Sequence, residues 1–258
     1  MALAYISLND WAFFIALGVA PSLIWLWYYL KKDEHPEPKL MILKAFIFGF
    51  ISTFLAFGLE FLFMKTLLGD GSNCPECEYD LPKMLGLSAG KDFFILSFVF
   101  LGVLAYIEEA VKYLAAKISA LRSKAFDEPV DAMVYLVVAA LGFAAAENIG
   151  YILQDMNNAV GIAYFRFLSS TFIHALASAV AGYFFAFAVL RKKNVAFYAA
   201  LGLIFATAIH AMFNAFIVLA EGNSRFLILV AILIASAAIT VSFLFAHIKK
   251  LSLNEQRN

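Results

Sequence analysis

From Ala105 to Leu114 the chain reads AYIEEAVKYL, which places Glu108, Glu109 and Lys112 inside a run that is otherwise apolar from Phe93 to Ala116. That run can cross a bilayer, because a membrane-spanning helix needs roughly 20 apolar residues. A charged side chain at the centre of such a helix costs about 2.5–3.5 kcal/mol on insertion scales, so two adjacent carboxylates there indicate a function. Lys112 lies one helical turn from both glutamates and can neutralise only one of them. The remaining carboxylate is the feature that the rest of the chain has to explain.

The composition predicts an all-α, multi-pass membrane protein. Of the 258 residues, 64% are hydrophobic and only 15% are charged, whereas soluble proteins are about 45–50% apolar and about 25% charged. The alternating pattern of outer-membrane barrel strands is absent, so the spans are expected to be helices. No basic stripe with interleaved aromatic residues indicates binding to nucleic acid.

The apolar runs divide the chain into about seven helices within one integral-membrane domain covering residues 1–258. Residues 65–91 form the longest polar connection, which we expect to be extracytoplasmic. The expected spans are Trp11–Leu30, Leu40–Met64, Phe93–Ala116, Val130–Leu153, Val160–Leu190, Val195–Ala220 and Phe226–His247.

The distribution of lysine and arginine predicts the orientation. Thirteen of these residues fall near the odd-numbered connections and in the C-terminal tail, against five on the other side. Because cytoplasmic segments carry the excess of basic residues, the N-terminus is expected outside and the C-terminus in the cytoplasm.

Eight polar residues lie deep within four of these spans. Such residues are expected to face the interior of the bundle or a watery cavity, and to face one another. At 1.5 Å per residue, a single cavity opening toward the outer leaflet can hold the whole set. Its members are Glu108, Glu109, Lys112, Glu147, Asn148, His174, His210 and Asn214.

Two hydrolytic chemistries use this combination of residues. In the first, His174, His210 and Glu109 hold a zinc ion while Glu108 acts as the general base, and the sequence allows the two glutamates to exchange these roles. In the second no metal takes part: Glu108 activates a water, one histidine orients it, and Asn214 with the other histidine donates to the developing oxyanion. The linear His-Glu-x-x-His signature is absent, so a metal site would have to be assembled across helices.

Five short motifs, taken in order, resemble those of the PrsW family of intramembrane proteases. More distantly they resemble the type II CAAX prenyl endopeptidases and the related bacteriocin-processing proteins. The resemblance covers roughly residues 20–220, the expected protease-like core. The motifs are Asp33-Glu34-His35-Pro36-Glu37-Pro38, Glu-Glu-x-x-Lys at 108–112, the segment 142–151 (GFAAAENIGY), His174-Ala175-Leu176 with Gly182, and His210-Ala211-Met212-Phe213-Asn214.

The resemblance implies an intramembrane endopeptidase in a prokaryotic cell membrane. Its implied catalytic residues are Glu108, Glu109, His174, His210 and Asn214. Members of the family are usually called metalloproteases, whereas the CAAX relatives are argued to use a glutamate-activated water. The implied partner is a membrane-tethered protein substrate, and in the family's best-known role that substrate is an anti-sigma factor cut on its extracytoplasmic side.

Several further residues are expected to have supporting or structural roles. Lys112 is expected to hold one glutamate. Glu147, Asn148 and Tyr151 are expected to line the substrate entry, to supply a further metal ligand or to join helices. The other readings are paired or interfacial structural charges for Glu60 and Arg166, structural roles for Asp131 and Tyr135, and a disulfide between Cys74 and Cys77 if their compartment is oxidising.

Two functions from other classes remain open at this point. A proton-coupled transporter also places glutamate and histidine within its spans. Such a protein should show paired broken helices in two halves of the chain, and the sequence has none that we can identify. A non-catalytic relative that binds membrane proteins is the other alternative, although retention of the whole polar set argues against it.

Overall fold

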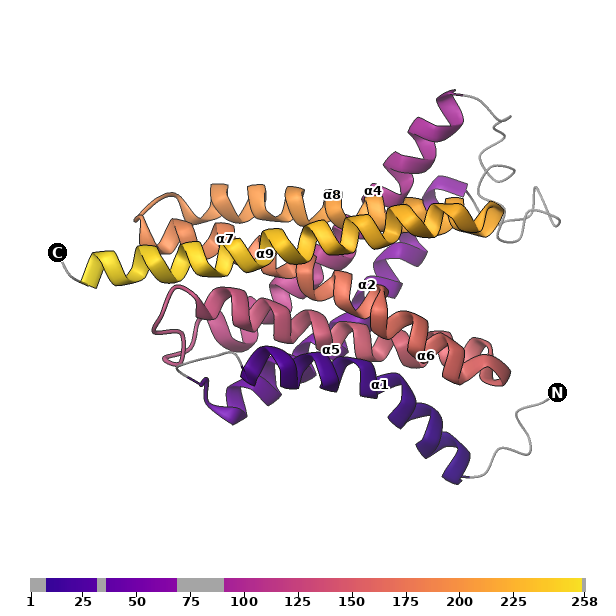
Figure 1. The fold of residues 1–258 in the computed structure, drawn as a ribbon, viewed down its shortest axis with the longest axis horizontal. Coiled ribbons are helices and arrows are strands. Elements are labelled where there is room, and N and C mark those ends of the chain that lie inside the picture. The colour runs from indigo at the N-terminus through magenta and orange to yellow at the C-terminus, as the bar shows by residue number, and fades with distance from the viewer. Residues whose placement is uncertain (1–7, 32–35, 69–90, 257–258) are drawn as a thin grey trace.

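The structure is a computed structural model that describes residues 8–31, 36–68 and 91–256. The described residues form a bundle of helices without strands (Figure 1). The helices are α1 (Leu8–Lys31), α2 (Lys39–Leu68), α4 (Lys91–Ala116) with a π-helical turn at Lys117–Leu121, α5 (Asp131–Gln154), α6 (Ala159–Leu168), α7 (Ser170–Leu190), α8 (Val195–Gly222) and α9 (Leu227–Gln256). Each expected span is therefore helical, and the all-α prediction is confirmed.

Six segments of the described chain are long and apolar enough to cross a membrane, which makes this a multi-pass membrane protein. They are Asn9–Lys31, Lys39–Leu67, Asp131–Gln154, Met156–Leu190, Val195–Gly222 and Ser224–Glu255. The 26-residue helix α4 is not among them. Glu108, Glu109 and Lys112 interrupt its apolar run, so the seventh crossing stays a prediction.

The fifth expected span, Val160–Leu190, is two helices rather than one. The backbone leaves the helical conformation at Ser169, with φ −123° and ψ −86°, between α6 and α7. The break lets α6 pack against α1, α5 and α7 and places Arg166 beside the polar centre of the bundle. Nothing in the sequence predicts this break, because neither proline nor glycine occurs between Phe165 and Thr171.

Helix α5 is the centre of the bundle and packs against α1, α2 and α7. Two glycines let α2 and α5 touch through their backbones. A Cβ added at Gly49 would lie 1.9 Å from the Ala139 carbonyl oxygen, and one added at Gly142 would lie 2.0 Å from that of Phe46. Small residues at helix contacts are how membrane bundles achieve close packing. This contact fixes α5, and with it Glu147, relative to α2.

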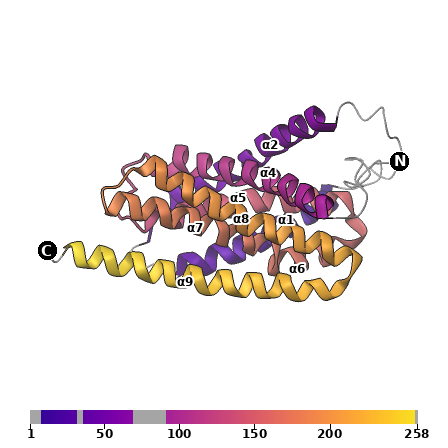
Figure 2. The same ribbon diagram turned by 90° about the horizontal axis from the view of Figure 1, so that it is seen from above.

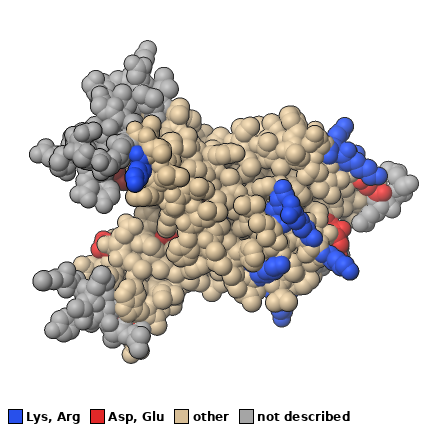
Figure 3. All heavy atoms as spheres, turned by 180° about the vertical axis from the view of Figure 1, so that it is seen from behind, with Lys and Arg blue, Asp and Glu red and all other residues tan. Residues whose placement is uncertain are grey.

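The two ends of the bundle differ in charge. The connection between α7 and α8 and the C-terminal end of α9 lie at one end, and the α8–α9 connection lies at the other (Figures 1 and 2). Lysine and arginine side chains gather at the first end, whereas the second is hollowed, with acidic side chains within the hollow (Figure 3). The basic end is the one that we expect to be cytoplasmic, and this orientation stays a prediction.

Candidate active site

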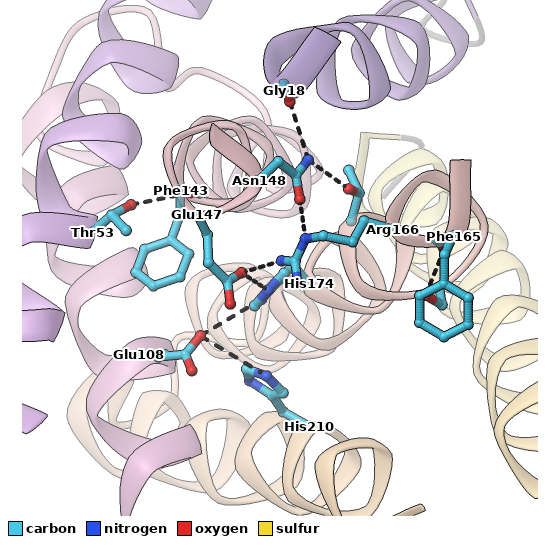
Figure 4. Close-up of polar contacts among 12 residues, drawn as sticks. Gly18, Thr53, Glu108, Phe143, Glu147, Asn148, Phe165, Arg166, His174 and His210 are labelled. Atoms are coloured by element: carbon cyan, nitrogen blue, oxygen red, sulfur yellow. Dashed lines mark hydrogen bonds and ion pairs between the residues drawn. The ribbon is translucent and has the colours of Figure 1, made fainter. Parts of the chain in front are cut away.

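Four helices bring two carboxylates and two imidazoles together at the centre of the bundle (Figure 4). Glu108 comes from α4, Glu147 from α5, His174 from α7 and His210 from α8. The imidazole rings of His174 and His210 lie 4.8 Å apart, centroid to centroid. Residues that the sequence scatters over about 100 positions thus form one cluster.

Lys112 is the internal cation of this cluster. Its side chain is fully buried, and its Nζ lies 2.8 Å from Glu109 Oε1 and 3.4 Å from Glu108 Oε2. The same Nζ lies 2.7 Å from Nδ1 of His174. An ammonium can only donate, so the ring proton of a neutral His174 is on Nε2. That nitrogen donates to Glu147 Oε2 at 2.8 Å.

Glu109 faces the protein interior, and both of its oxygens are engaged. Oε1 accepts from Lys112 and lies 3.0 Å from His210 Nδ1, while Oε2 accepts from Ser178 Oγ at 3.0 Å. Because an ionised carboxylate only accepts, Nδ1 of His210 carries the proton and Nε2 of a neutral His210 keeps its lone pair. Glu109 therefore holds both Lys112 and His210 in place.

Glu108 is the carboxylate that remains. Its Oε2 is buried and makes no hydrogen bond among the described residues. The atom lies 3.9 Å from His174 Nδ1 and 3.9 Å from His210 Nε2. Buried polar atoms are nearly always hydrogen-bonded, so an exception needs an explanation.

The explanation lies in a cavity of about 630 Å³ that Glu108 lines together with Glu147, His174 and His210. Its wall continues to Glu221, close to the C-terminal end of α8. At about 1.5 Å per residue, Glu221 lies roughly 16 Å along the helix from His210. The cavity thus leads from the end that holds the α8–α9 connection down to the cluster. Its opening toward the outer leaflet stays a prediction, as the orientation does.

Arg166 of α6 is part of this site, which the sequence analysis did not anticipate. Its Nη2 donates to Glu147 Oε2 at 2.7 Å, and its Nε donates to Asn148 Oδ1. The guanidinium lies 4.2 Å from the centre of the Tyr151 ring. Arg166 lines the cavity and orients the carboxylate that accepts from His174. The available signal was an arginine within an apolar run.

The other supporting residues divide between the cavity and the packing. Tyr151 and Asn214 line the cavity. Asn148 is fully buried and joins helices, because its Nδ2 donates to the Gly18 carbonyl oxygen and to Thr171 Oγ1. Glu147 lines the cavity and is hydrogen-bonded directly to His174.

Ser178 is a second residue that the sequence analysis missed. It follows His174 by one helical turn, so both side chains lie on the same face of α7. His174 is in the cavity wall while Ser178 donates to Glu109 behind it. The His-x-x-x-Ser spacing was the signal that could have identified it.

The donor set at the cavity fits zinc in kind and number. One ligand atom each from Glu108, His174 and His210 lies within 4.8 Å of the others, and two imidazoles with one carboxylate are a known set for catalytic zinc. The hydrogen-bond-free oxygen of Glu108 is consistent with a ligand role. His174 Nδ1 would have to exchange its hydrogen bond with Lys112 for the ion.

The set differs from the one expected, which contained Glu109 in place of Glu108. Successive residues of a helix point about 100° apart. Glu109 consequently faces Lys112, Ser178 and His210 Nδ1, and Glu108 faces the cavity. Cys74 and Cys77 lie outside the described residues.

Comparison with known proteins identifies the family of this chain. Residues 37–242 match the family described as PrsW family intramembrane metalloprotease. The chain is 29% identical over 171 residues to "Protease PrsW" of Bacillus subtilis (strain 168), covering 66% of each chain. It is 30% identical to "Protease PrsW" of Geobacillus kaustophilus (strain HTA426) over 71% of this chain and 70% of the relative.

A third relative, "Protease PrsW" of Clostridioides difficile (strain 630), is 28% identical over 65% of this chain and 63% of its own length. The chain thus spans about two thirds of the length of these curated bacterial relatives. No solved structure matches it. Since the family match covers most of the chain and contains all the cavity residues of α4, α5, α7 and α8, the chain belongs to the PrsW family of intramembrane metalloproteases.

Proposed function

We propose that this protein is an intramembrane endopeptidase that hydrolyses a peptide bond of a membrane-tethered protein. One observation carries the proposal: Glu108 Oε2 is buried without a hydrogen bond, faces a cavity, and lies 3.9 Å from each of two imidazoles. An ionised carboxylate in that setting is a strong proton acceptor. The cavity gives a peptide segment a route to it.

Glu108 is the general base in this account. It takes a proton from a water whose oxygen attacks the carbonyl carbon of the substrate. It then delivers the proton to the amide nitrogen as the carbon–nitrogen bond breaks, leaving a carboxylic acid and an amine. His210 Nε2, 3.9 Å from Glu108 Oε2, accepts a hydrogen bond from the attacking water and orients it. Proton transfer by a positioned side chain contributes about 10²- to 10⁴-fold to a rate.

The surrounding residues hold this arrangement. Asn214 lines the cavity one turn beyond His210, and its amide is the donor for the oxyanion that develops on the carbonyl oxygen. Lys112 and Glu147 bind the two nitrogens of His174. If zinc takes part, Glu108, His174 and His210 would hold it, and the ion would polarise the water and the scissile carbonyl.

The test is cleavage of tagged single-span proteins by the purified protein in detergent. The comparison is between wild type, Glu108→Gln and the control Glu255→Gln, which changes an exposed glutamate paired with Arg191. We expect Glu108→Gln to lower the rate by about 10²-fold or more, and the control to match wild type. Cleavage by Glu108→Gln at the wild-type rate would refute the assignment. Failure of the wild type on every protein would favour a non-catalytic binder.

Metal dependence is decided in the same preparation. Zinc bound per chain is measured by elemental analysis before and after dialysis against a chelator. Activity that falls with the zinc content and returns on its addition supports the zinc mechanism. Full activity in zinc-free protein supports hydrolysis by Glu108 without metal.

A further inference from the structure

One carboxylate of the cavity has no role in the chemistry described so far. The charged residues in the cavity wall are Glu60, Glu108, Glu147, Glu221 and Arg166. Glu147 is neutralised by Arg166, and Glu108 is the proposed base beside Lys112. Glu221 lies at the cavity mouth, close to the end of α8. Glu60 remains.

Glu60 is a partly buried carboxylate whose Oε1 is shielded from solvent and which has no countercharge among the described residues. It lies on α2, and its Oε1 makes no hydrogen bond among the described residues. The sequence predicts an interfacial or a paired structural charge here, and no ion pair in the described part of the chain includes Glu60. The basic groups of the site are already engaged: Arg166 with Glu147 and Asn148, and Lys112 with Glu109 and His174. Burying a carboxylate without a partner is unfavourable, so such groups mark places where something binds.

The packing of α2 against α4 gives the depth of Glu60. Towards one end of the contact, the Phe63 and Phe100 rings lie 5.8 Å apart. Towards the other, Ala56 shares an apolar cluster with Val111. These two contacts show that α2 and α4 run antiparallel. Interpolation between them places Glu60 level with the part of α4 around residues 103–107. Glu108 is therefore deeper by about 2–8 Å at 1.5 Å per residue.

This offset corresponds to one or two residues of the substrate. A peptide bond within an intact helix is shielded by the side chains around it, so the segment at Glu108 has to be extended. An extended chain rises about 3.3 Å per residue. A side chain one or two positions from the scissile bond thus passes Glu60.

We propose that Glu60 is a specificity-determining residue that pairs with a cationic side chain, lysine or arginine, one or two residues from the scissile bond. This inference rests on the proposed protease function and adds the class of substrate. A lysine or arginine of the substrate neutralises the Glu60 carboxylate inside the cavity. A neutral or acidic residue at the same substrate position leaves this carboxylate without a countercharge. Discrimination by a buried polar group left without its partner is typically strong.

The experiment uses a single-span protein that the wild type cleaves. Lysine, glutamine and glutamate are placed in turn at each of the two positions on either side of the scissile bond. We expect wild type to prefer lysine over glutamine at least 10-fold in kcat/KM at one of these positions. Glu60→Gln should bring that ratio close to one. Glu221→Gln, which removes the same charge from the cavity mouth, should leave the ratio unchanged.

A binding measurement supplies a second readout that does not require cleavage. In the Glu108→Gln background, fluorescent peptides with lysine or glutamine at the preferred position are titrated onto the protein in detergent. A preference for the lysine peptide that disappears in Glu60→Gln/Glu108→Gln supports the proposal. Equal affinities of the lysine and glutamine peptides for Glu108→Gln would overturn it. A lysine-to-glutamine ratio of kcat/KM that Glu60→Gln does not alter would also overturn it. Cleavage that depends on Glu108 but not on the charge of the substrate side chains near the scissile bond would refute this inference while the protease function stands.

Discussion

Two clusters of this protein each bring three potential metal ligands within 4.8 Å of one another: Glu108, His174 and His210, and, separately, Glu37, Asp127 and Asp131. In the second cluster, Asp131 Oδ2 accepts from the backbone nitrogens of Asp127 and Glu128, at 3.1 and 2.7 Å. Tyr135 donates its hydroxyl to Glu37. The first two hydrogen bonds hold the segment before α5 against the start of that helix, and the third joins α5 to the segment before α2.

The difference between the clusters shows what separates an active site from a structural one. Both clusters bring potential metal ligands close together. In the first cluster, a buried carboxylate oxygen has no hydrogen bond and faces a cavity with two imidazoles. In the second, carboxylate oxygens are used to fix the backbone. Reactivity is thus expected where a polar atom is left open toward a space, and stability where it is satisfied.

The largest effect on stability is expected from Lys112→Met, because it leaves Glu109 buried without its cation. Removing one partner of a buried ion pair costs about 3–5 kcal/mol. Chemical unfolding of the detergent-solubilised protein measures the loss. The double variant Lys112→Met/Glu109→Gln should recover part of it, because it also removes the orphaned charge. A single variant as stable as wild type would mean that the cluster does not depend on its internal cation.

Zinc binding should distinguish the two clusters, because only the first contains histidines. His210→Ala removes a ligand of the first cluster and is expected to lower zinc affinity by more than the about 10- to 100-fold typical of outer-shell changes. Asp131→Asn should leave the affinity unchanged. Titration with zinc and a competing chelator measures both. The reverse pattern would assign the ion to the carboxylate cluster.

Asp131→Asn is expected to act on stability alone. The amide oxygen can still accept, but the other oxygen is replaced by an NH₂ group that cannot, so the hydrogen bonds from the backbone nitrogens of Asp127 and Glu128 are weakened at a cost of about 1–3 kcal/mol. The cleavage rate per folded molecule should match that of wild type. Thermal unfolding and a rate normalised to the folded fraction test this together. A loss of rate without a loss of stability would give the second cluster a role in catalysis.

Ser178→Ala is expected to have the smallest effect. Its hydroxyl donates to Glu109 Oε2 from behind the site, and a hydrogen bond of this kind is worth about 0.5–1.5 kcal/mol, or more where the acceptor is charged. The cleavage rate should fall only modestly, because Lys112 and His210 still hold Glu109. A rate loss as large as that of Glu108→Gln would place Ser178 in the chemistry itself.

Much of the fold could be predicted from the sequence, because each apolar run had to form a helix in lipid. The break at Ser169 could not be, since neither proline nor glycine occurs between Phe165 and Thr171. The members of the polar set could be named from their cost in the membrane. Their pairing required the tertiary structure: Arg166 reaches Glu147 only because α6 turns away from α7.

The glutamate pair illustrates the same limit. The sequence indicates that Lys112 neutralises one of the two, and the i+3 and i+4 spacings are equally good. The packing of α4 against α7 and α8 decides between them, placing Glu109 against Ser178 and His210 and leaving Glu108 in the cavity.

The most direct test of the central claim compares Glu108→Gln with Asp131→Asn on one single-span protein that the wild type cleaves, under single-turnover conditions. Each removes one carboxylate from one cluster by replacing a single oxygen with an amide nitrogen. The account predicts a loss of about 10²- to 10⁴-fold for Glu108→Gln and a wild-type rate per folded molecule for Asp131→Asn. Equal rates for the two variants would contradict it.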